Sequence, residues 1–263
     1  MTFSYSDADI AGLISEFTDP RVREAVELAA LPDILKDTSY FIDVGANVGQ
    51  YTFHAAKHLR NAKLVAIEAN PFLIHVLTRT VDNLRLHDSP DNEYEIHAAA
   101  VSDMPGALKF YVSKYPTLSS VFQQDTAEQV EVPTLALDTL WRPSVRTVIK
   151  IDVEGVEYRV IRSGRKFLRS NQTCFFVELH SWGDRTIRKY PIHVCWLFFT
   201  HGYASRKIGT HYFFYRASWS KRTFSFMREF PSLGLKYLIC RYAAGLQPTI
   251  SRLRKRLSRV IPH

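Results

Sequence analysis

The fold class is decided by residues 41–51, FIDVGANVGQY, in which an apolar run enters a glycine-containing loop and leaves it as an amphipathic segment. Gly45 and Gly49 stand where the backbone must turn sharply and where a Cβ would block the approach of a ligand. Such a loop, at the carboxyl end of a buried strand, is where open α/β sheets bind their ligands. The stretch therefore predicts a strand, a ligand-binding loop and a helix that starts near Gln50.

Apolar runs of strand length alternate with longer amphipathic segments on both sides of this loop, a pattern typical of parallel βαβ units. The predicted strands are 40–44, 64–67, 96–101, 148–153, 175–179 and 211–215, and the predicted helices are 51–59, 72–86 and 192–200. Residues 8–36 show the apolar spacing of helices, and residues 106–140 predict a β-rich insertion before the fourth core strand. The chain is thus predicted to be an α/β protein.

The composition of the chain fits an ordinary globular protein. Of its 263 residues, 46% are hydrophobic and 23% charged, which excludes disordered and collagen-like classes. The first residues lack the pattern of a signal peptide, and no apolar run reaches the roughly 20 residues of a membrane span. Three widely spaced cysteines indicate neither a disulfide framework nor a cysteine zinc site. We therefore expect a cytoplasmic protein.

The loop favours S-adenosylmethionine over a dinucleotide as its ligand. Dinucleotide sites use G-x-G-x-x-G, whereas this loop has only Gly45-x-x-x-Gly49, and no phosphate-binding P-loop is present. Asp43, just before the loop, suits a ligand with a positive ammonium group. Glu68 ends the next apolar run, where an acid can accept hydrogen bonds from the ribose hydroxyls of either cofactor. An NAD(P)-dependent oxidoreductase therefore remains the alternative enzyme.

Five segments of the chain resemble, in this order, the FkbM-type family of S-adenosylmethionine-dependent methyltransferases. They are FIDVGANVGQYT, IEANP, HAAAVSD, IKIDVEGVE and FVELH, and the resemblance spans about residues 38–216. It implies a seven-stranded, Rossmann-like methyltransferase sheet, S-adenosylmethionine as the cofactor, and in most members transfer to an oxygen of a polyketide, glycan or other secondary product. It also implies cofactor contacts by position: Asp43, Gly45, Asn47 and Gly49 on the methionine and ribose side, Glu68 at the ribose hydroxyls with Asn70 beside it, and Val101-Ser102 at the adenine.

Acidic residues and one histidine follow two predicted strands and form the candidate catalytic group. Asp152 and Glu154 alternate at the end of one strand, and Glu178 and His180 alternate at the end of another. If the two strands are neighbours, these side chains come together beside the glycine loop. Methyl transfer to a hydroxyl needs alignment and a base. His180, oriented by Glu178, is a candidate base, and Asp152 is the other.

Two other interpretations of this group stay open. His180 can be a structural histidine that takes no part in the chemistry. The carboxylates and His180 can also hold a divalent cation, but no compact ligand motif is present, so no metal is predicted. Glu157 is predicted to be an acid at a helix start, where the helix dipole favours negative charge.

The positive charge of the chain is concentrated in residues 217–263, whose net charge is +9, whereas residues 1–216 carry −1. The segment 249–261 places apolar residues on one helical face and Arg or Lys on the rest, a pattern typical of helices that bind membrane surfaces or partners. We expect this extension to bind the inner face of a membrane. Packing onto the body and binding of another partner are alternatives, and the neutral body disfavours nucleic acid.

These observations divide the chain into an N-terminal helical cap (1–37), a methyltransferase domain (38–216) and a basic amphipathic C-terminal extension (217–263). The predicted function is S-adenosylmethionine-dependent methylation of a hydroxyl on a sugar, glycan or secondary metabolite. A non-catalytic, membrane-associated binding module with the same fold is the alternative from a different class.

Overall fold

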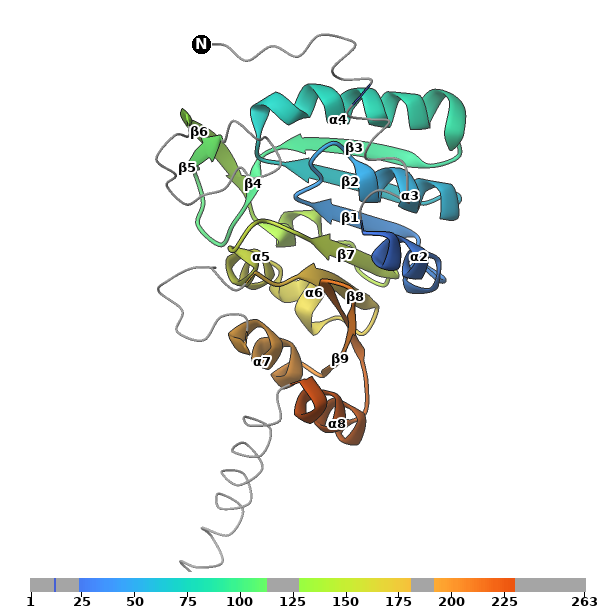
Figure 1. Ribbon diagram of the computed structural model, residues 1–263, viewed down its shortest axis with the longest axis vertical. Helices are drawn as coiled ribbons and strands as arrows, with labels where there is room; N and C mark the ends of the chain where they lie inside the picture. The colour runs from blue at the N-terminus through green and yellow to red at the C-terminus, as the bar shows by residue number, and fades with distance from the viewer. Residues whose placement is uncertain (1–11, 13–23, 113–127, 181–191, 230–263) are drawn as a thin grey trace, which may run out of the picture.

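The computed structural model describes residues 12, 24–112, 128–180 and 192–229. At its centre is an open seven-stranded sheet in the order β3-β2-β1-β7-β8-β10-β9, with helices on both faces (Figure 1). The strands are β1 (Tyr40–Val44), β2 (Lys63–Glu68), β3 (Glu93–Ala98), β7 (Thr147–Ile151), β8 (Thr173–Glu178), β9 (Tyr203–Ile208) and β10 (His211–Arg216). The first five in sheet order pair in parallel, and β10 pairs antiparallel with both of its neighbours. The predicted α/β class and seven-stranded sheet are therefore confirmed.

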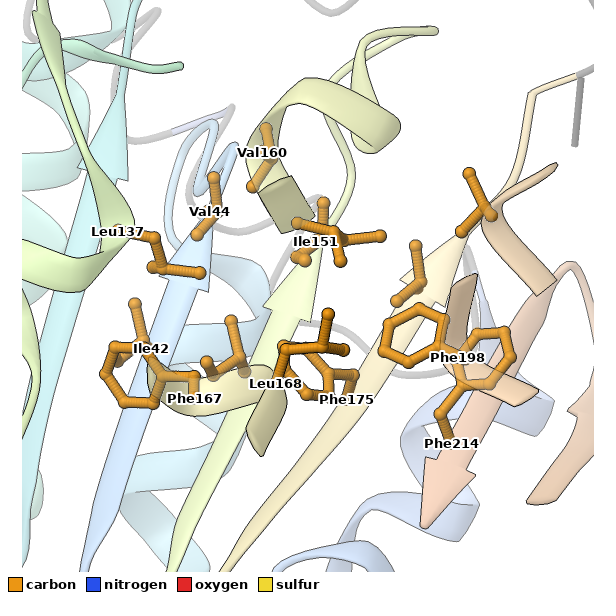
Figure 2. Close-up of a cluster of buried hydrophobic side chains, with 14 of the residues drawn as sticks. Ile42, Val44, Leu137, Ile151, Val160, Phe167, Leu168, Phe175, Phe198 and Phe214 are labelled. Carbon is orange, nitrogen blue, oxygen red and sulfur yellow. The ribbon is translucent and has the colours of Figure 1, made fainter. Parts of the chain in front are cut away.

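The central strands are apolar because helices cover both of their faces, and every residue of β1 and β7 is buried. One face is covered by α2 (Ala25–Ile34), α3 (Gln50–His58) and α4 (Pro71–Asn83), and the other by α5 (Glu157–Ser163), α6 (Arg165–Arg169) and α7 (Ile192–Thr200). Figure 2 shows the second interface, where Phe167 and Phe198 from the helices meet Phe175 and Phe214 from the strands. This packing holds the carboxyl ends of the strands in fixed positions.

The predicted β insertion forms a small sheet beyond the carboxyl ends of β2 and β3 (Figure 1). Its strands are β4 (Ala100–Val101), β5 (Ala107–Val112) and β6 (Glu128–Leu135), and the last two pair antiparallel. The single strand predicted over 96–101 is wrong, because the chain leaves the central sheet after Ala98. The Ala99 N–H still donates to the Glu68 carbonyl at 3.0 Å, and the next residues pair with β6 instead.

Two further elements differ from the sequence-based expectation. The helix predicted over 72–86 ends at Asn83 and continues as a π-helical turn, η1 (Leu84–Asp88). The strand β9 was not predicted, because the exposed Arg206 and Lys207 interrupt the apolar pattern of this edge strand.

The first and last described segments pack on the body of the protein. Glu27 of α2 accepts a hydrogen bond from the Thr210 N–H at 2.6 Å, in the turn between β9 and β10. The helix α8 (Trp219–Glu229) packs against α7 and β9, with Phe226 buried in the main core. Parts of the predicted cap and extension therefore contact the central sheet, and the division into three parts stays a prediction.

The amphipathic segment 249–261 and most of the predicted helix over 8–36 lie outside the described residues. None of the helices within the described ranges is long and apolar enough to cross a membrane.

We predict that Phe198→Ala lowers the free energy of unfolding by about 3–5 kcal/mol, because it removes a fully buried ring from the core. This ring stacks on Phe214, with 3.9 Å between ring centroids, and contacts Phe175 at 4.9 Å. Urea unfolding followed by circular dichroism measures the change. The matched control is Phe224→Ala, since Phe224 is 69% exposed and its loss should change stability by at most about 0.5 kcal/mol. Equal effects of the two substitutions would contradict this assignment of the core.

Candidate active site

The glycine loop joins β1 to α3 and lies directly against the end of β7. Gly45 has a φ of +75°, and a Cβ built on it would lie 1.8 Å from the backbone oxygen of Asp152. Gly49, at φ +90°, is the N-cap of α3, and a Cβ there would press on Leu77 and Thr80 of α4 at 3.0–3.1 Å. The first glycine thus permits contact between the two central strand ends, and the second permits packing of two helices.

Asp43 lies beneath this loop and is completely buried. Its Oδ2 accepts hydrogen bonds from the N–H (3.0 Å) and the hydroxyl (2.8 Å) of Thr52, which ties β1 to α3. Its Oδ1 lies 3.5 Å from Nζ of Lys150, a buried residue of β7. Lys150 also donates to the Gly45 carbonyl at 3.1 Å and lies 3.6 Å from Asp152. Burial lowers the pKa of Lys150, but the charges of Asp152 and Asp43 outweigh burial and raise this pKa above its ordinary value.

A cavity of about 380 Å³ opens above the loop, between the ends of the central strands and the small sheet. Five of the predicted cofactor residues line it, namely Gly45, Asn47, Glu68, Val101 and Ser102. Asp152 and Glu154 line it as well, and Leu108, Phe110 and Thr134 contribute the wall from the small sheet. Asp43, Gly49 and Asn70 do not line the cavity. Direct contact of these three with a cofactor stays a prediction.

Glu68 is the buried carboxylate on the β2 side of the cavity. Its Oε1 accepts the N–H of Asn70 at 2.7 Å and its Oε2 accepts the N–H of Asn47 at 2.8 Å. Burial raises the pKa of Glu68, and these backbone donors and the charge of Lys150 act in the opposite direction. The Asn70 side chain accepts the Phe72 N–H at 3.0 Å as the N-cap of α4, so it helps to fix the end of β2.

The predicted catalytic residues come together at the carboxyl ends of β7 and β8. Ligand atoms of Asp152, Glu178 and His180 lie within 4.8 Å of one another. His180 Nδ1 lies 2.7 Å from Oε1 of Glu157, and Nε2 lies 3.5 Å from Glu154 and 3.9 Å from Asp152. The carboxylate on Nδ1 is therefore Glu157, in place of the Glu178 that the sequence suggested.

Glu157 and Lys150 are residues of this site whose roles the sequence did not reveal. Glu157 is the first residue of α5, as its helix-start prediction requires, but it is completely buried and accepts the Gly155 N–H at 2.9 Å. No spacing in the sequence links it to His180. The role of this buried acid becomes recognisable only when the fold brings His180, which follows β8, to the start of α5.

Burial and nearby charges shift the pKa values of these carboxylates and of His180 in different directions. Burial favours protonation of Asp152, but Lys150 and the neighbouring histidines outweigh burial and lower its pKa. Burial and the charge of Asp152 raise the pKa of Glu178 to about 7. Burial lowers the pKa of His180, but its hydrogen bond to Glu157 and the charges of three carboxylates raise it to about 9. Burial raises the pKa of Glu157, although its hydrogen bond to His180 opposes this.

A family model described as the methyltransferase FkbM domain matches residues 43–205. This chain belongs to the FkbM methyltransferase family. Its cofactor is therefore S-adenosylmethionine, which removes the NAD(P)-dependent oxidoreductase as an alternative.

Several solved structures are similar to this FkbM family member. They include the precorrin-6y C5,15-methyltransferase of Geobacter metallireducens (10% identity, TM-score 0.41, 72% of this chain and 87% of that chain). They also include an rRNA methylase of Streptococcus thermophilus (10% identity, TM-score 0.40, 74% of this chain and 96% of that chain). A third is an O-methyltransferase family protein of Burkholderia thailandensis (8% identity, TM-score 0.42, 81% of this chain and 61% of that chain). No curated protein matches the chain. At 8–10% identity, these similarities do not indicate the substrate of this chain.

The residues of the cavity fit the cofactor of the FkbM family. The volume of about 380 Å³ lies in the range of small-molecule sites. Each oxygen of Glu68 accepts one backbone N–H and keeps a lone pair with which it can accept a ribose hydroxyl. Gly45 leaves the loop free of a side chain next to Asp152, where a Cβ would collide with backbone. The site thus offers a polar end at Glu68 and an apolar wall at the small sheet.

We predict that Gly45→Ala abolishes binding of S-adenosylhomocysteine, because the added Cβ forces the end of β1 away from Asp152. Isothermal titration calorimetry measures the affinity. Gly106→Ala is the matched control, since Gly106 also has a positive φ, of +107°, but its Cβ would meet nothing within 4 Å. Both variants share the backbone strain, so only the steric collision differs between them. Unchanged binding by Gly45→Ala would remove the glycine loop from the cofactor site.

Proposed function

We propose that this FkbM family member methylates an oxygen nucleophile, a hydroxyl on a sugar, glycan or secondary metabolite. The carboxylate and histidine group at the ends of β7 and β8 carries this proposal. Asp152 belongs both to this group and to the lining of the cofactor cavity, so proton-accepting groups lie next to the donor site.

S-adenosylmethionine supplies a methyl group on a sulfonium, an already activated donor. The chain must then hold the acceptor in line with that group and take the proton that a hydroxyl loses when it is methylated. Glu68 and Gly45 border the space for the donor, and Asp152, which lies against Gly45, belongs both to this lining and to the carboxylate and histidine group. The four carboxylates and one histidine of this group can accept the proton that the hydroxyl loses.

Screening of the full-length protein tests the proposed reaction. S-adenosylmethionine with an isotope-labelled methyl group is offered with hydroxylated sugars, glycans and polyketides, and in parallel with amines and carbon nucleophiles. We expect label in a methyl ether, identified by mass spectrometry and NMR, and no label with the Gly45→Ala variant. Label found only on nitrogen or carbon acceptors would overturn the proposal.

We further propose that residues 217–263 bind an anionic membrane surface. The described part of this segment, α8, exposes two aromatic side chains, Trp219 and Phe224, and the basic Lys221. The rest of the segment contributes five basic residues over 252–259. Each basic residue near an anionic leaflet contributes about 1 kcal/mol, an attraction that salt screens.

Replacement of Arg252, Arg254, Lys255, Arg256 and Arg259 by Gln should abolish sedimentation with phosphatidylserine vesicles at low salt. Vesicles of phosphatidylcholine alone provide the neutral comparison, and unchanged S-adenosylhomocysteine binding provides the control for folding. Sedimentation that is equal with both vesicle types, or unaffected by the five substitutions, would contradict a membrane role for this charge.

A further inference from the structure

We propose that Asp152 binds the ammonium group at the amino-acid end of S-adenosylmethionine, and that Asp43 acts on this site only through Lys150. The cofactor follows from the family, so this inference does not depend on which acceptor is methylated. It moves to Asp152 the contact that the sequence favoured for Asp43, which stands just before the glycine loop.

The lining of the cavity differs in chemistry on the two sides of Glu68. Toward the small sheet, the wall includes the apolar Leu108 and Phe110, which suit the flat adenine ring. In the other direction, β2 is followed in the sheet by β1 and β7, whose ends contribute Gly45 and Asp152 to the lining. With the ribose hydroxyls at Glu68, the adenine lies toward the small sheet and the charged amino-acid end extends toward β7.

Asp152 is a carboxylate that a ligand can reach at the β7 side of the cavity. Its side chain is 22% exposed and lines the cavity, whereas Asp43 is completely buried and does not line it. The Asp152 N–H donates to the Val44 carbonyl at 3.0 Å, which continues the pairing of β7 with β1. The Gly45 loop lies against the same backbone, because a Cβ on Gly45 would lie 1.8 Å from the Asp152 backbone oxygen. The carboxylate is therefore carried by backbone that is held in place.

The Asp152 carboxylate has acceptor capacity left for a ligand. Its Oδ2 lies 3.6 Å from Nζ of Lys150 and its Oδ1 lies 3.9 Å from Nε2 of His180, and both distances exceed those of ordinary hydrogen bonds. Within the described part of the chain, Oδ1 accepts no hydrogen bond. An ammonium group offers three N–H donors, which a carboxylate with free lone pairs can accept.

The Asp43 carboxylate is held by groups of the protein itself. Its Oδ2 accepts both the N–H and the hydroxyl of Thr52, and its Oδ1 faces Nζ of Lys150 at 3.5 Å. The same Nζ donates to the Gly45 carbonyl at 3.1 Å and lies beside Asp152. Asp43 therefore helps to fix Lys150, and Lys150 in turn positions the loop and the carboxylate that border the cavity.

The charges around Lys150 leave one negative charge for the cofactor to compensate. Asp43 and Asp152 carry two negative charges, and Lys150 carries one positive charge. A buried charge is costly unless an opposite charge lies beside it. The ring of His180 does not fill this role, because it lies closer to Glu157, at 2.7 Å, than to Asp152. The ammonium of the cofactor supplies the positive charge that Asp152 lacks.

The affinities of two ligands test this contact. S-adenosylhomocysteine carries the ammonium, and its analogue with hydrogen in place of the amino group lacks it. Isothermal titration calorimetry of the full-length protein, with EDTA to remove divalent cations, should show that S-adenosylhomocysteine binds about 10-fold more tightly or better. Asp152→Asn should reduce this preference at least about fivefold and leave the affinity for the analogue within about twofold, because only the charge at the ammonium is lost. Equal affinities of the wild type for both ligands, or an equal loss of both in a folded Asp152→Asn variant, would overturn the proposal.

Two variants with the same change of charge serve as controls. Glu154→Gln removes a carboxylate that also lines the cavity but lies 3.5 Å from Nε2 of His180. Asp43→Asn removes the buried partner of Lys150. Both variants should keep the preference for the ligand with the ammonium, even where Asp43→Asn weakens the two ligands alike. A preference that disappears with either control and persists with Asp152→Asn would assign the ammonium to another carboxylate and refute the proposal.

A crystal structure of the wild-type complex with S-adenosylhomocysteine tests the contact without any substitution. We expect the ammonium nitrogen within about 3 Å of a carboxylate oxygen of Asp152. An ammonium that lies away from Asp152 would contradict the proposal. Neither measurement needs a methyl acceptor, so its outcome is separate from that of the proposed transfer to oxygen.

Discussion

The arrangement of the active site depends on the buried ammonium of Lys150 in β7. It donates to the Gly45 carbonyl and lies within 3.6 Å of both Asp43 and Asp152. A charge in this position would destabilise the fold if it were unpaired, since a buried charge without a partner is costly. Here the two carboxylates compensate it, and the three groups hold the ends of β1 and β7 together. The pairing of these two strands also brings Gly45 close to the Asp152 backbone.

A second cluster of charged side chains lies on the other side of Asp152. Four carboxylates from the ends of β7 and β8 and from the start of α5 surround one histidine. Like charges so close together cannot all stay ionised unless cations compensate them. Lys150 lowers the pKa of Asp152, whereas burial raises the pKa values of Glu154, Glu157 and Glu178. This FkbM family member thus holds two carboxyl groups whose pKa values are shifted in opposite directions, Asp152 and Glu178, within 4.8 Å of each other.

The cofactor side and the acceptor side of the site differ in construction. On the cofactor side, Glu68 is fixed by the backbone N–H groups of Asn47 and Asn70, so its position depends on two rigid turns. The small sheet completes this side with apolar residues such as Phe110. On the side where we propose that the acceptor binds, the groups are side chains at strand ends. A rigid donor site beside a side-chain cluster allows one fold to hold a common cofactor while the acceptor region differs between proteins.

The sequence by itself determined the α/β class, the glycine loop and the positions of Glu68, Asp152 and His180 at strand ends. These are local properties: strands buried on both faces are apolar throughout, and a loop under a ligand needs glycine. Tertiary structure alone decided that Glu157 pairs with His180 and that Lys150 joins Asp43 to Asp152. It also decided that the chain changes sheets after Ala98. These features depend on contacts between elements far apart in the chain, and the protonation of each group depends on all charges around it at once.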